Sequence, residues 1–508
     1  MPQAISTDVV IVGAGPTGLM LASCLSKLGV GAVIVDGKSG PTRESRALVL
    51  QARTMEIYDQ LGLVDRVLAQ AEIASSIVPG FGKKSFAPVN LRRLATGVTP
   101  YPHLYVLEQS KNERLLVDHL REQGRDVLWN CELESIEEVA GNGVRVACRT
   151  SDGEALTITA RYCVGADGSS SAVRRLTGVE FEGKTNEHTF YVLDATGVRG
   201  LHHGSINLRF GERDFLLTFP MDSTDHERLL GVVRTTDRAT VDESVARDTL
   251  ARAFGITYGT SLWFSTYRVH HRVARQFRSG SVFLAGDAAH VHSPVGAQGM
   301  NTGLQDAHNL AAKIADVVFG RAADAYLDRY EAERRPVARR LVSTTDTMFG
   351  VVTSDRLLAR MIRRSFIPLF APLAASIAPR LPGPSRIFEY LSQTRIHYWM
   401  SDEARQNARG RRGSVVGRRL PWNGDNFDSL RSMAWQVHAY GDVPAESVRE
   451  LQLALALPIL TFATIRNRKL ASGMLYLVRP DGFVAAAATP DDAPATFAGA
   501  LADPLRAG

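Results

Sequence analysis

Three glycines near the amino terminus have the spacing of a phosphate-binding loop. Gly13, Gly15 and Gly18 directly follow a short β-branched run and precede a helical pattern. In such a loop the first glycine permits a tight turn, the second lets the backbone approach a pyrophosphate, and the third lets the helix pack on the strand. Asp36 closes the next strand, near the spacing of about 20 residues at which an acid binds ribose hydroxyls. The pattern predicts an adenine dinucleotide, either FAD or NAD.

Two later segments also combine glycine and aspartate. The segment CVGADGSSSAVR places Asp167 directly after an apolar strand, and FLAGDAAHVHSPVGAQGMNTGLQDAHNL places Asp287 in a Gly-Asp turn. A carboxylate in such a turn can accept hydrogen bonds from hydroxyl groups. Residues 296–301 form a glycine loop that begins a helix, where the backbone amides of Met300 and Asn301 would stabilise negative charge. A turn-capping role stays open for Asp287, and a purely structural turn for Asp167.

In order and content, these three motifs resemble those of the class A flavoprotein monooxygenases, the para-hydroxybenzoate hydroxylase family. The resemblance covers about residues 1–340 and is greatest to the longer aromatic-polyketide and phenol hydroxylases. The positions that match in the second and third motifs are Gly165, Asp167, Gly168, Ser171, Arg174, Gly286, Asp287, Ala288, His290, Pro294, Gly296, Gly299, Asn301, Asp306 and Asn309.

The resemblance implies an enzyme with non-covalently bound FAD, NADPH or NADH as the reductant and O2 as the oxidant. The expected reaction is hydroxylation of a phenolic or polycyclic polyketide-like aromatic substrate through a C4a-hydroperoxyflavin. Because the cofactor carries the difficult chemistry, the protein needs no catalytic triad. Baeyer–Villiger oxidation or epoxidation on the same fold, and a non-catalytic FAD-binding accessory protein, remain alternatives.

The resemblance also implies roles for individual residues around the flavin. It places Asp287 on the ribityl hydroxyls and Pro294 beside the reactive C4a edge. The amides of Met300 and Asn301 would face the N1/C2=O edge of the reduced flavin. We therefore expect Pro294, Met300 and Asn301 to be the catalytic residues.

Two further side chains are expected to reach the cofactor from the first third of the chain. Arg46 would meet the pyrophosphate as a charge-assisted partner, whereas Arg53 is expected in a structural ion pair. Gln109 would contact the flavin, unless it only begins a solvated helix. The full set of expected cofactor-binding residues is Gly13, Gly15, Pro16, Thr17, Gly18, Asp36, Arg46, Gln109, Asp167, Gly286, Asp287, Pro294, Gly296, Gly299, Met300 and Asn301.

The elements that must position these residues predict an α/β fold with a Rossmann-like FAD-binding domain. A strand at 8–12, a helix at 15–28 and a strand at 30–36 open a parallel βαβ unit, which strand-like residues 281–285 extend. Alternating segments from 182 to 267 predict an inserted antiparallel sheet for the substrate. Helical sequence follows at about 303–377.

The expected domains comprise residues 1–181, 182–267, 268–404 and 405–508. The first and third of these segments together form one FAD-binding domain, the third with its long helices. The last domain follows a linker rich in glycine and arginine, and GMLYLVRPDGFVA resembles the thioredoxin-like domain of the longer hydroxylases. It contains no cysteine, which excludes a redox role and leaves packing, folding support or dimerisation.

Strand alternation in the inserted sheet gives candidates for the substrate pocket. Side chains of a strand point to opposite faces in turn, so an error of one residue in register inverts the set. The candidates are Tyr191, Asn207, Arg209, Phe215, Thr218 and Phe219.

Composition narrows the partners and the location. A net charge of +6 spread along 508 residues, without a basic block, makes nucleic acid an unexpected partner. The four cysteines form no CxxC pair and are expected to be buried free thiols, and the amino terminus has no signal-peptide pattern, so we expect a cytoplasmic protein. Residues 366–378 are apolar but too short to span a bilayer, which leaves peripheral membrane contact open. His290 and His292 lack a third ligand, so no metal is expected. The sequence leaves monomer and homodimer open.

Overall fold

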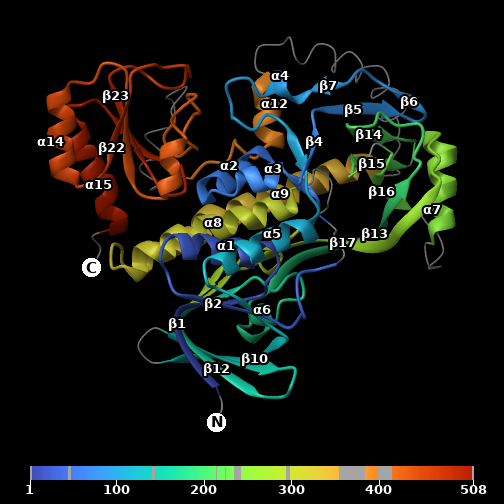
Figure 1. Cartoon of the computed structure of the whole chain (residues 1–508), viewed down its shortest axis with the longest axis horizontal. Helices are drawn as coiled ribbons and strands as arrows, with labels where there is room; N and C mark the ends of the chain where they lie inside the picture. The colour runs from blue at the N-terminus through green and yellow to red at the C-terminus, as the bar shows by residue number, and fades with distance from the viewer. Residues whose placement is uncertain are drawn as a thin grey trace.

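The structure of the chain, a computed structural model, is a mixed α/β fold. It describes residues 3–43, 47–139, 143–212, 214–222, 225–233, 242–292, 298–353, 384–398 and 415–505. Within these ranges the strands form four sheets, and the two largest lie at different ends of the molecule with helices between them (Figure 1). The expected α/β class is confirmed.

The first sheet is built around the strand that precedes the glycine loop. β1 (Gln3–Val12) lies between β2 (Ala32–Asp36) and β12 (Ala155–Gly165), and β9 (Val127–Trp129) and β19 (Val282–Leu284) extend the parallel part on either side. The antiparallel strands β10 (Cys131–Val139), β11 (Gly143–Thr150) and β18 (Arg278–Ser279) complete it. The strands predicted at 8–12, 30–36 and 281–285 are therefore confirmed in kind and place.

Helices cover this sheet and carry the candidate residues. α1 (Pro16–Lys27) packs on β1 and β2, with α5 (Gln109–Glu122), α8 (Gly299–Val318), α2 (Ala52–Leu61) and α3 (Val64–Leu68) around it. α6 (Ala172–Leu176) contacts β10 and β12 directly. The helical sequence expected from 303 to 377 begins at Gly299 and is interrupted after Val318, because a short 3-10 helix, Asp324–Leu327, turns the chain into α9 (Asp328–Thr353). The expected helix beyond 353 and the apolar segment 366–378 lie outside the described residues.

The second sheet has nine strands among the described residues. Its antiparallel body consists of β13 (Phe181–Thr196), β14 (Ile206–Phe210), β15 (Phe215–Pro220), β16 (Glu227–Val233) and β17 (Thr260–Ala274), with β20 (His290–Val291) at one edge. At the other edge, β5 (Ser76–Phe81) pairs in parallel with β14, and β6 (Lys84–Ser85) and β7 (Val89–Asn90) follow. The sheet thus takes strands from residues 76–90, a contribution that strand alternation within 182–267 did not predict.

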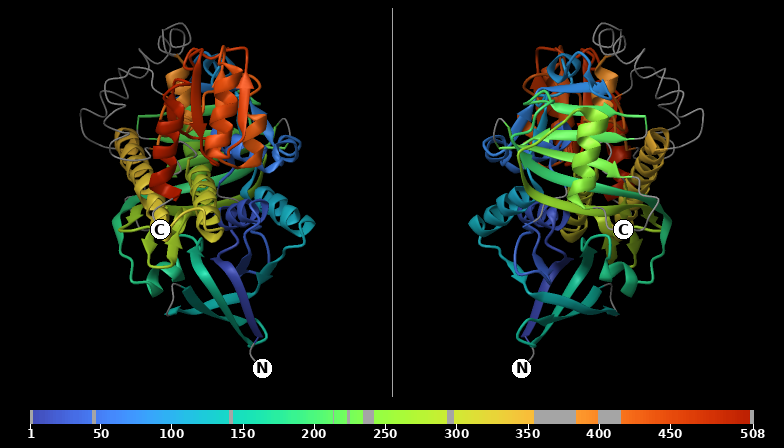
Figure 2. Two further views of the ribbon diagram at one scale, coloured as in Figure 1. Left: turned by 90° about the vertical axis from the view of Figure 1, so that its left-hand side faces the viewer. Right: turned by 90° about the vertical axis from the view of Figure 1, so that its right-hand side faces the viewer.

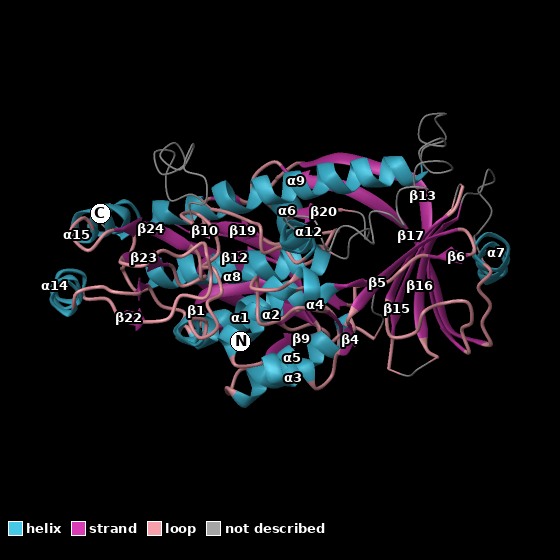
Figure 3. Cartoon of the chain, turned by 90° about the horizontal axis from the view of Figure 1, so that it is seen from above, coloured by secondary structure: helices cyan, strands magenta, loops and turns pink. Residues whose placement is uncertain are grey.

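The two faces of the second sheet are covered differently. α7 (Glu243–Thr249) and the π-helix Leu250–Phe254 cover the outer face, at the far right of Figure 3. The inner face packs on the three-stranded sheet of β3 (Val49–Leu50), β8 (Leu104–Val106) and β4 (Glu72–Ala74), on α4 (Leu91–Leu94), and on α12 (Pro384–Leu391) through Phe388. The inner face is therefore the one that meets the part of the chain that contains the glycine loop.

Residues 415–505 form a small α/β unit beside α8 and α9 (Figure 2). Its four strands are β21 (Gln436–Tyr440), β22 (Ile459–Phe462), β23 (Met474–Val478) and β24 (Val484–Ala488), in the order β22-β21-β23-β24. α14 (Ala445–Leu455) and α15 (Ala493–Leu505) pack on one side, around Val437, Leu477 and Phe497. A 3-10 helix, Asp428–Ser432, and a second apolar cluster lie on the other side.

All four cysteines are buried and unpaired, as expected. Within the ranges described above, no helix is both long and apolar enough to cross a bilayer. No group of three histidine, cysteine or acidic residues in those ranges could hold a metal ion.

Candidate functional site

The glycine loop leaves open space in front of a helix amino terminus. Gly13 has a φ of +106°, and a Cβ there would lie 2.4 Å from the carbonyl oxygen of Ala166. A Cβ on Gly18 would lie 1.9 Å from the carbonyl oxygen of Gly13, so this glycine lets α1 pack on β1. A Cβ on Gly15 would meet nothing within 4 Å. Gly15 also caps α1 without a side-chain hydrogen bond, and Pro16 follows it, so the positive end of α1 faces this space.

Asp36 fastens this loop to the end of β2. Its Oδ2 accepts a hydrogen bond from the backbone N–H of Ala14 at 2.6 Å, and its Oδ1 accepts one from that of Lys38 at 2.8 Å. Each carboxylate oxygen keeps further acceptor capacity, because an ionised carboxylate offers about four lone-pair sites. Asp36 can therefore hold the loop and accept ribose hydroxyls at the same time.

Asp167 lies against the other side of the loop. Its Oδ2 accepts hydrogen bonds from the N–H groups of Ala172 at 2.6 Å and Val173 at 3.1 Å, at the start of α6. Its Oδ1 is buried and has no hydrogen-bond partner. The structural and the cofactor-binding interpretations of Asp167 are therefore both compatible with its contacts. One carboxylate oxygen caps a helix, and the other can accept a hydrogen bond from a ligand.

The Gly-Asp turn at Gly286–Asp287 lies against the glycine loop at Thr17. A Cβ on Gly286 or on Gly303 would each lie 2.4 Å from Thr17 Oγ1, so the turn, α1 and α8 approach as closely as glycine permits. Asp287 is exposed although its neighbours Gly286 and Ala288 are buried, which places its carboxylate in an opening between packed elements. Desolvation by the surrounding protein raises the pKa of Asp287; His290 opposes this shift, and the charge of Asp306 adds to it.

The start of α8 is held by the side chain of Asn301. Its Oδ1 accepts hydrogen bonds from Gln51 N at 2.9 Å and Thr54 Oγ1 at 2.7 Å, and its Nδ2 donates to the Val49 carbonyl at 2.7 Å. The Asn301 side chain is therefore a structural clamp, and a role toward the flavin would fall to the backbone at this helix start. Met300 packs against the core, and its sulfur lies 3.8 Å from Asn112 Nδ2.

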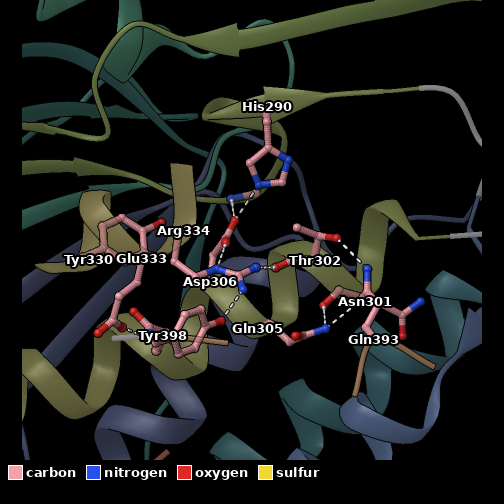
Figure 4. A network of polar contacts seen from close by, with 12 residues as sticks. His290, Asn301, Thr302, Gln305, Asp306, Tyr330, Glu333, Arg334, Gln393 and Tyr398 are labelled. Carbon is pink, nitrogen blue, oxygen red and sulfur yellow. Dashed lines mark hydrogen bonds and ion pairs between the residues drawn. The ribbon is translucent and has the colours of Figure 1, made fainter. Parts of the chain in front are cut away.

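A buried charge network lies directly behind these elements. Asp306 accepts from Gly286 N at 3.1 Å, His290 Nε2 at 2.7 Å and Arg334 Nε at 2.6 Å. Figure 4 shows Arg334 between Asp306 and Tyr398, whose hydroxyl lies 2.5 Å from Arg334 Nη1. Burial alone would raise the pKa of Asp306, but the charges of Arg334 and His290 outweigh it and lower the pKa. The spacing of the sequence motifs did not predict a role for Arg334. Arg334 lies on α9, and only the fold brings it opposite Asp306.

The remaining expected cofactor residues have mixed outcomes. Gln109 begins α5 and donates through Nε2 to Glu113 at 2.9 Å. Arg53 lies in a buried ion pair with Glu56 at 3.1 Å, as expected. Arg46, Pro294 and Gly296 lie outside the described residues. The structure brings together Gly13, Gly15, Pro16, Thr17, Gly18, Asp36, Asp167, Gly286 and Asp287, with the Gly299–Asn301 end of α8 joined to them through Gly303.

The expected substrate residues divide between the two faces of the second sheet. Phe215 and Phe219 lie on the inner face with Leu104 and Val106. Tyr191 lies on the outer face with Leu250 and Phe254. The other outer-face candidates are Asn207, which donates to Thr218 Oγ1 at 3.1 Å, and Arg209, which donates to the Gly200 carbonyl at 2.8 Å. The set could not all face one ligand, because Phe215 and Thr218 are three positions apart in one strand.

The space at Gly15, the open acceptor of Asp167 and the exposed Asp287 fit a dinucleotide that lies on the end of α1. Residues 6–345 match the family model described as an FAD binding domain. A 6-methylpretetramide 4-monooxygenase of Streptomyces rimosus is 35% identical over 416 residues, which cover 79% of this chain and 73% of that protein. This chain belongs to the FAD-dependent monooxygenase family.

Other flavoprotein monooxygenases agree with this membership. A rifampicin monooxygenase of Streptomyces venezuelae is 33% identical over 381 residues, covering 70% of this chain and 75% of that one. The solved structure of the OxyS anhydrotetracycline hydroxylase of Streptomyces rimosus superposes with a TM-score of 0.78 and 26% identity, over 99% of both chains. As a flavoprotein monooxygenase, the chain is an enzyme that uses FAD and O2, with NAD(P)H as the reductant typical of the family.

Proposed function

We propose that this flavoprotein monooxygenase hydroxylates an electron-rich aromatic ring of a phenol or a polycyclic polyketide, held on the inner face of the second sheet. The observation that carries this proposal is the composition of that face. Phe190, Phe215 and Phe219 lie on it together with Ile206 and Leu217, and they face the part of the chain that contains the glycine loop. Flat aromatic ligands favour such surfaces because ring faces pack by offset stacking.

A polar group at the edge of the same face suits the orientation of a substrate. Arg228 pairs with Asp194 at 2.5 Å and lies 3.5 Å from Glu108, the residue before Gln109. Its guanidinium also lies 5.5 Å from the ring centroid of Trp263. A fixed charge beside an apolar face can orient a ring that bears hydroxyl groups, so we propose Arg228 and Asp194 as the polar end of the pocket. Both residues stand out in the alternation of their strands, because each is a charged residue at a position on the inner face where the other residues are apolar.

The division of labour follows from these positions. Bound FAD, reduced by NAD(P)H, supplies the oxygen-transferring chemistry with O2. The chain binds the dinucleotide at α1 and Asp36, holds the Gly286–Ala288 turn through Asp306, and excludes water with the aromatic inner face. Pro294, with the amides of Met300 and Asn301, stays the proposed catalytic set beside the flavin.

The deciding experiment follows flavin reduction and product formation in the FAD-loaded protein. Stopped-flow absorbance with NADPH and NADH, with and without phenols and polycyclic polyketides, is expected to show faster reduction with one aromatic class. Under ¹⁸O₂, the product should gain one labelled oxygen on an aromatic carbon. Labelled oxygen in a lactone would instead indicate Baeyer–Villiger oxidation, and labelled oxygen in an epoxide would indicate epoxidation. Bound FAD that NAD(P)H does not reduce would indicate an accessory protein.

We also propose the finer domain assignments. A mixed four-stranded sheet with α14 and α15 supports a thioredoxin-like unit within 405–508. The boundary at 181 fits the start of β13, whereas the second sheet extends past 267 through β17 and β20 and also takes the strands at 76–90. Four buried free thiols support a cytoplasmic location, because reducing compartments keep cysteines unpaired.

A further inference from the structure

The turn between β23 and β24 is buried, although hairpin turns ordinarily lie at the surface. Arg479 and Asp481 are each 2% exposed, and Phe483 is 3% exposed. Hydrogen bonds from Arg479 N to Phe483 O at 2.8 Å and from Gly482 N to Arg479 O at 2.9 Å close the turn. A turn with two buried charges must be held by partners from outside its own sheet.

The partners of the turn are on α8 and α9. Arg479 donates to Glu333 at 2.7 and 2.9 Å and to Asp481 at 2.6 Å. Glu333 in turn accepts from Lys313 and from Asn309, each at 2.8 Å. These contacts balance two cations against two carboxylates in the interior. The turn is therefore part of the packing between α8 and α9.

A second set of contacts leads from the turn to Asn301. The carbonyl oxygen of Asp481 accepts from Arg53 Nη2 at 2.6 Å, and the Arg53 guanidinium lies 5.3 Å from the ring centroid of Phe483. Arg53 is the second residue of α2, and the same end of α2 supplies Gln51 N and Thr54 Oγ1 to the Asn301 side chain. The turn and the flavin-facing end of α8 thus share one helix terminus.

A third set leads to the Gly-Asp turn. The rings of Phe483 and Tyr398 lie 4.2 Å apart between centroids. The Tyr398 hydroxyl bonds Arg334, Arg334 bonds Asp306, and Asp306 holds Gly286 N beside Asp287. Figure 4 shows the part of this path from Tyr398 to His290. The path thus consists of one ring contact, two polar contacts between side chains and one hydrogen bond to a backbone N–H, and its side chains are almost fully buried.

We propose that the turn Arg479–Phe483 is a positioning element for the flavin: it fixes the start of α8 and the Gly286–Ala288 turn, the two elements whose residues would hold FAD when it is bound. Arg479, Asp481 and Phe483 are positioning residues, since they act through Glu333, Arg53 and Tyr398. The proposal rests on FAD binding and not on the identity of the aromatic substrate.

The test compares Asp481→Asn and Phe483→Leu with Lys469→Ala. Lys469 joins the same unit to α12 through Glu389 at 2.7 Å, so it controls for a general loss of domain contact. In the FAD-free protein, the amides of residues 299–305 should exchange hydrogen about tenfold faster in the two turn variants. In the same two variants, the dissociation constant for FAD should rise by about threefold to thirtyfold, and the midpoint potential of the bound flavin should shift.

Two variants keep the proposal falsifiable if one fails to fold. Asp481→Asn removes a buried charge, whereas Phe483→Leu retains every ion pair of the turn and removes only the ring contacts with Tyr398 and Arg53. A lower melting temperature with unchanged exchange at 299–305 and unchanged flavin potential would make the turn merely structural and overturn the proposal. Failure to hydroxylate any aromatic would bear on the proposed function alone, because none of these readouts uses a substrate.

Discussion

The backbone N–H of Ala14 donates to the carboxylate of Asp36 at 2.6 Å, across 22 positions of sequence. The acid expected to bind the ribose is therefore also the residue that fixes the middle of the glycine loop. Its substitution should remove a ligand contact and the conformation of the loop together.

Replacement of Asp36 by alanine should weaken FAD binding by about tenfold to a hundredfold, since a hydrogen bond to a charged group contributes about 1.5–3 kcal/mol. Asp8→Ala is the matched control, because Asp8 Oδ2 accepts from Gly31 N at 3.0 Å between the same strands but away from the loop. Fluorescence titration of the FAD-free protein measures both. Equal affinity in the two variants would show that Asp36 serves only the fold.

The glycine loop offers two substitutions with opposite expected effects. Gly15→Ala puts a methyl group into open space, so the FAD-free protein should melt within about 2 °C of the wild type. Its FAD affinity should fall about tenfold or more, because the methyl group occupies cofactor space. Gly18→Ala should instead destabilise the FAD-free protein by about 1–3 kcal/mol, since its Cβ would overlap the Gly13 carbonyl. Calorimetry and FAD titration separate the two, and a Gly15→Ala protein with normal affinity would place the pyrophosphate elsewhere.

The two faces of the second sheet can be told apart by kinetics. Phe219→Leu on the inner face should raise the KM for the aromatic substrate by about tenfold, because the pocket loses ring contact. Tyr191→Phe on the outer face should leave KM and kcat unchanged. It should also stabilise the protein by about 1 kcal/mol, because the Tyr191 hydroxyl is buried without a partner. The reverse pattern would move the substrate to the outer face.

Glu227 should make stability depend on pH. Burial raises its pKa from the ordinary 4.5 to about 8, a shift that Thr218 partly opposes, and one of its oxygens has no partner. Between these values the folded protein retains a proton that the unfolded chain has released, so stability falls as pH rises from 4.5 to 8. Urea unfolding at several pH values should show Glu227→Gln increasingly more stable than the wild type across this window, by at most about 5 kcal/mol.

His203, whose Nδ1 lies 3.3 Å from Glu227, would reduce that difference when protonated. The exposed Glu450→Gln on α14 serves as the control. A constant difference between Glu227→Gln and the wild type at every pH would contradict a buried, protonated Glu227.

The parts of this fold that could be predicted are those whose pattern lies within a short stretch of sequence. The strand, glycine loop and helix at Asp8–Lys27 follow from local pattern, and Asp36 follows from one additional strand. The partners of Asn301 could not be predicted in this way, because Gln51 N lies 250 positions earlier in the chain. Only the folded chain brings β3 against α8.

The inner and outer faces of the second sheet show the same limit. Alternation within β15 correctly separates Phe219 from Thr218, but it does not state which face meets the FAD-binding part. The orientation of the sheet depends on α7 and on the strands from residues 76–90, and the sequence of β15 carries no information about either. The buried turn at Arg479 likewise reads as an ordinary exposed hairpin, since its partners Glu333 and Lys313 are far away in sequence.

The parallel pairing of β12 with both β1 and β19 has a consequence for synthesis. The strand that leads to the glycine loop leaves the ribosome first, but its neighbour β12 ends at Gly165 and β19 ends at Leu284. At about 5–20 residues per second, a nascent chain waits on the order of tens of seconds for these strands. Until then one edge of β1 has no pairing strand, and an unpaired strand edge of this kind favours non-native association in a nascent chain.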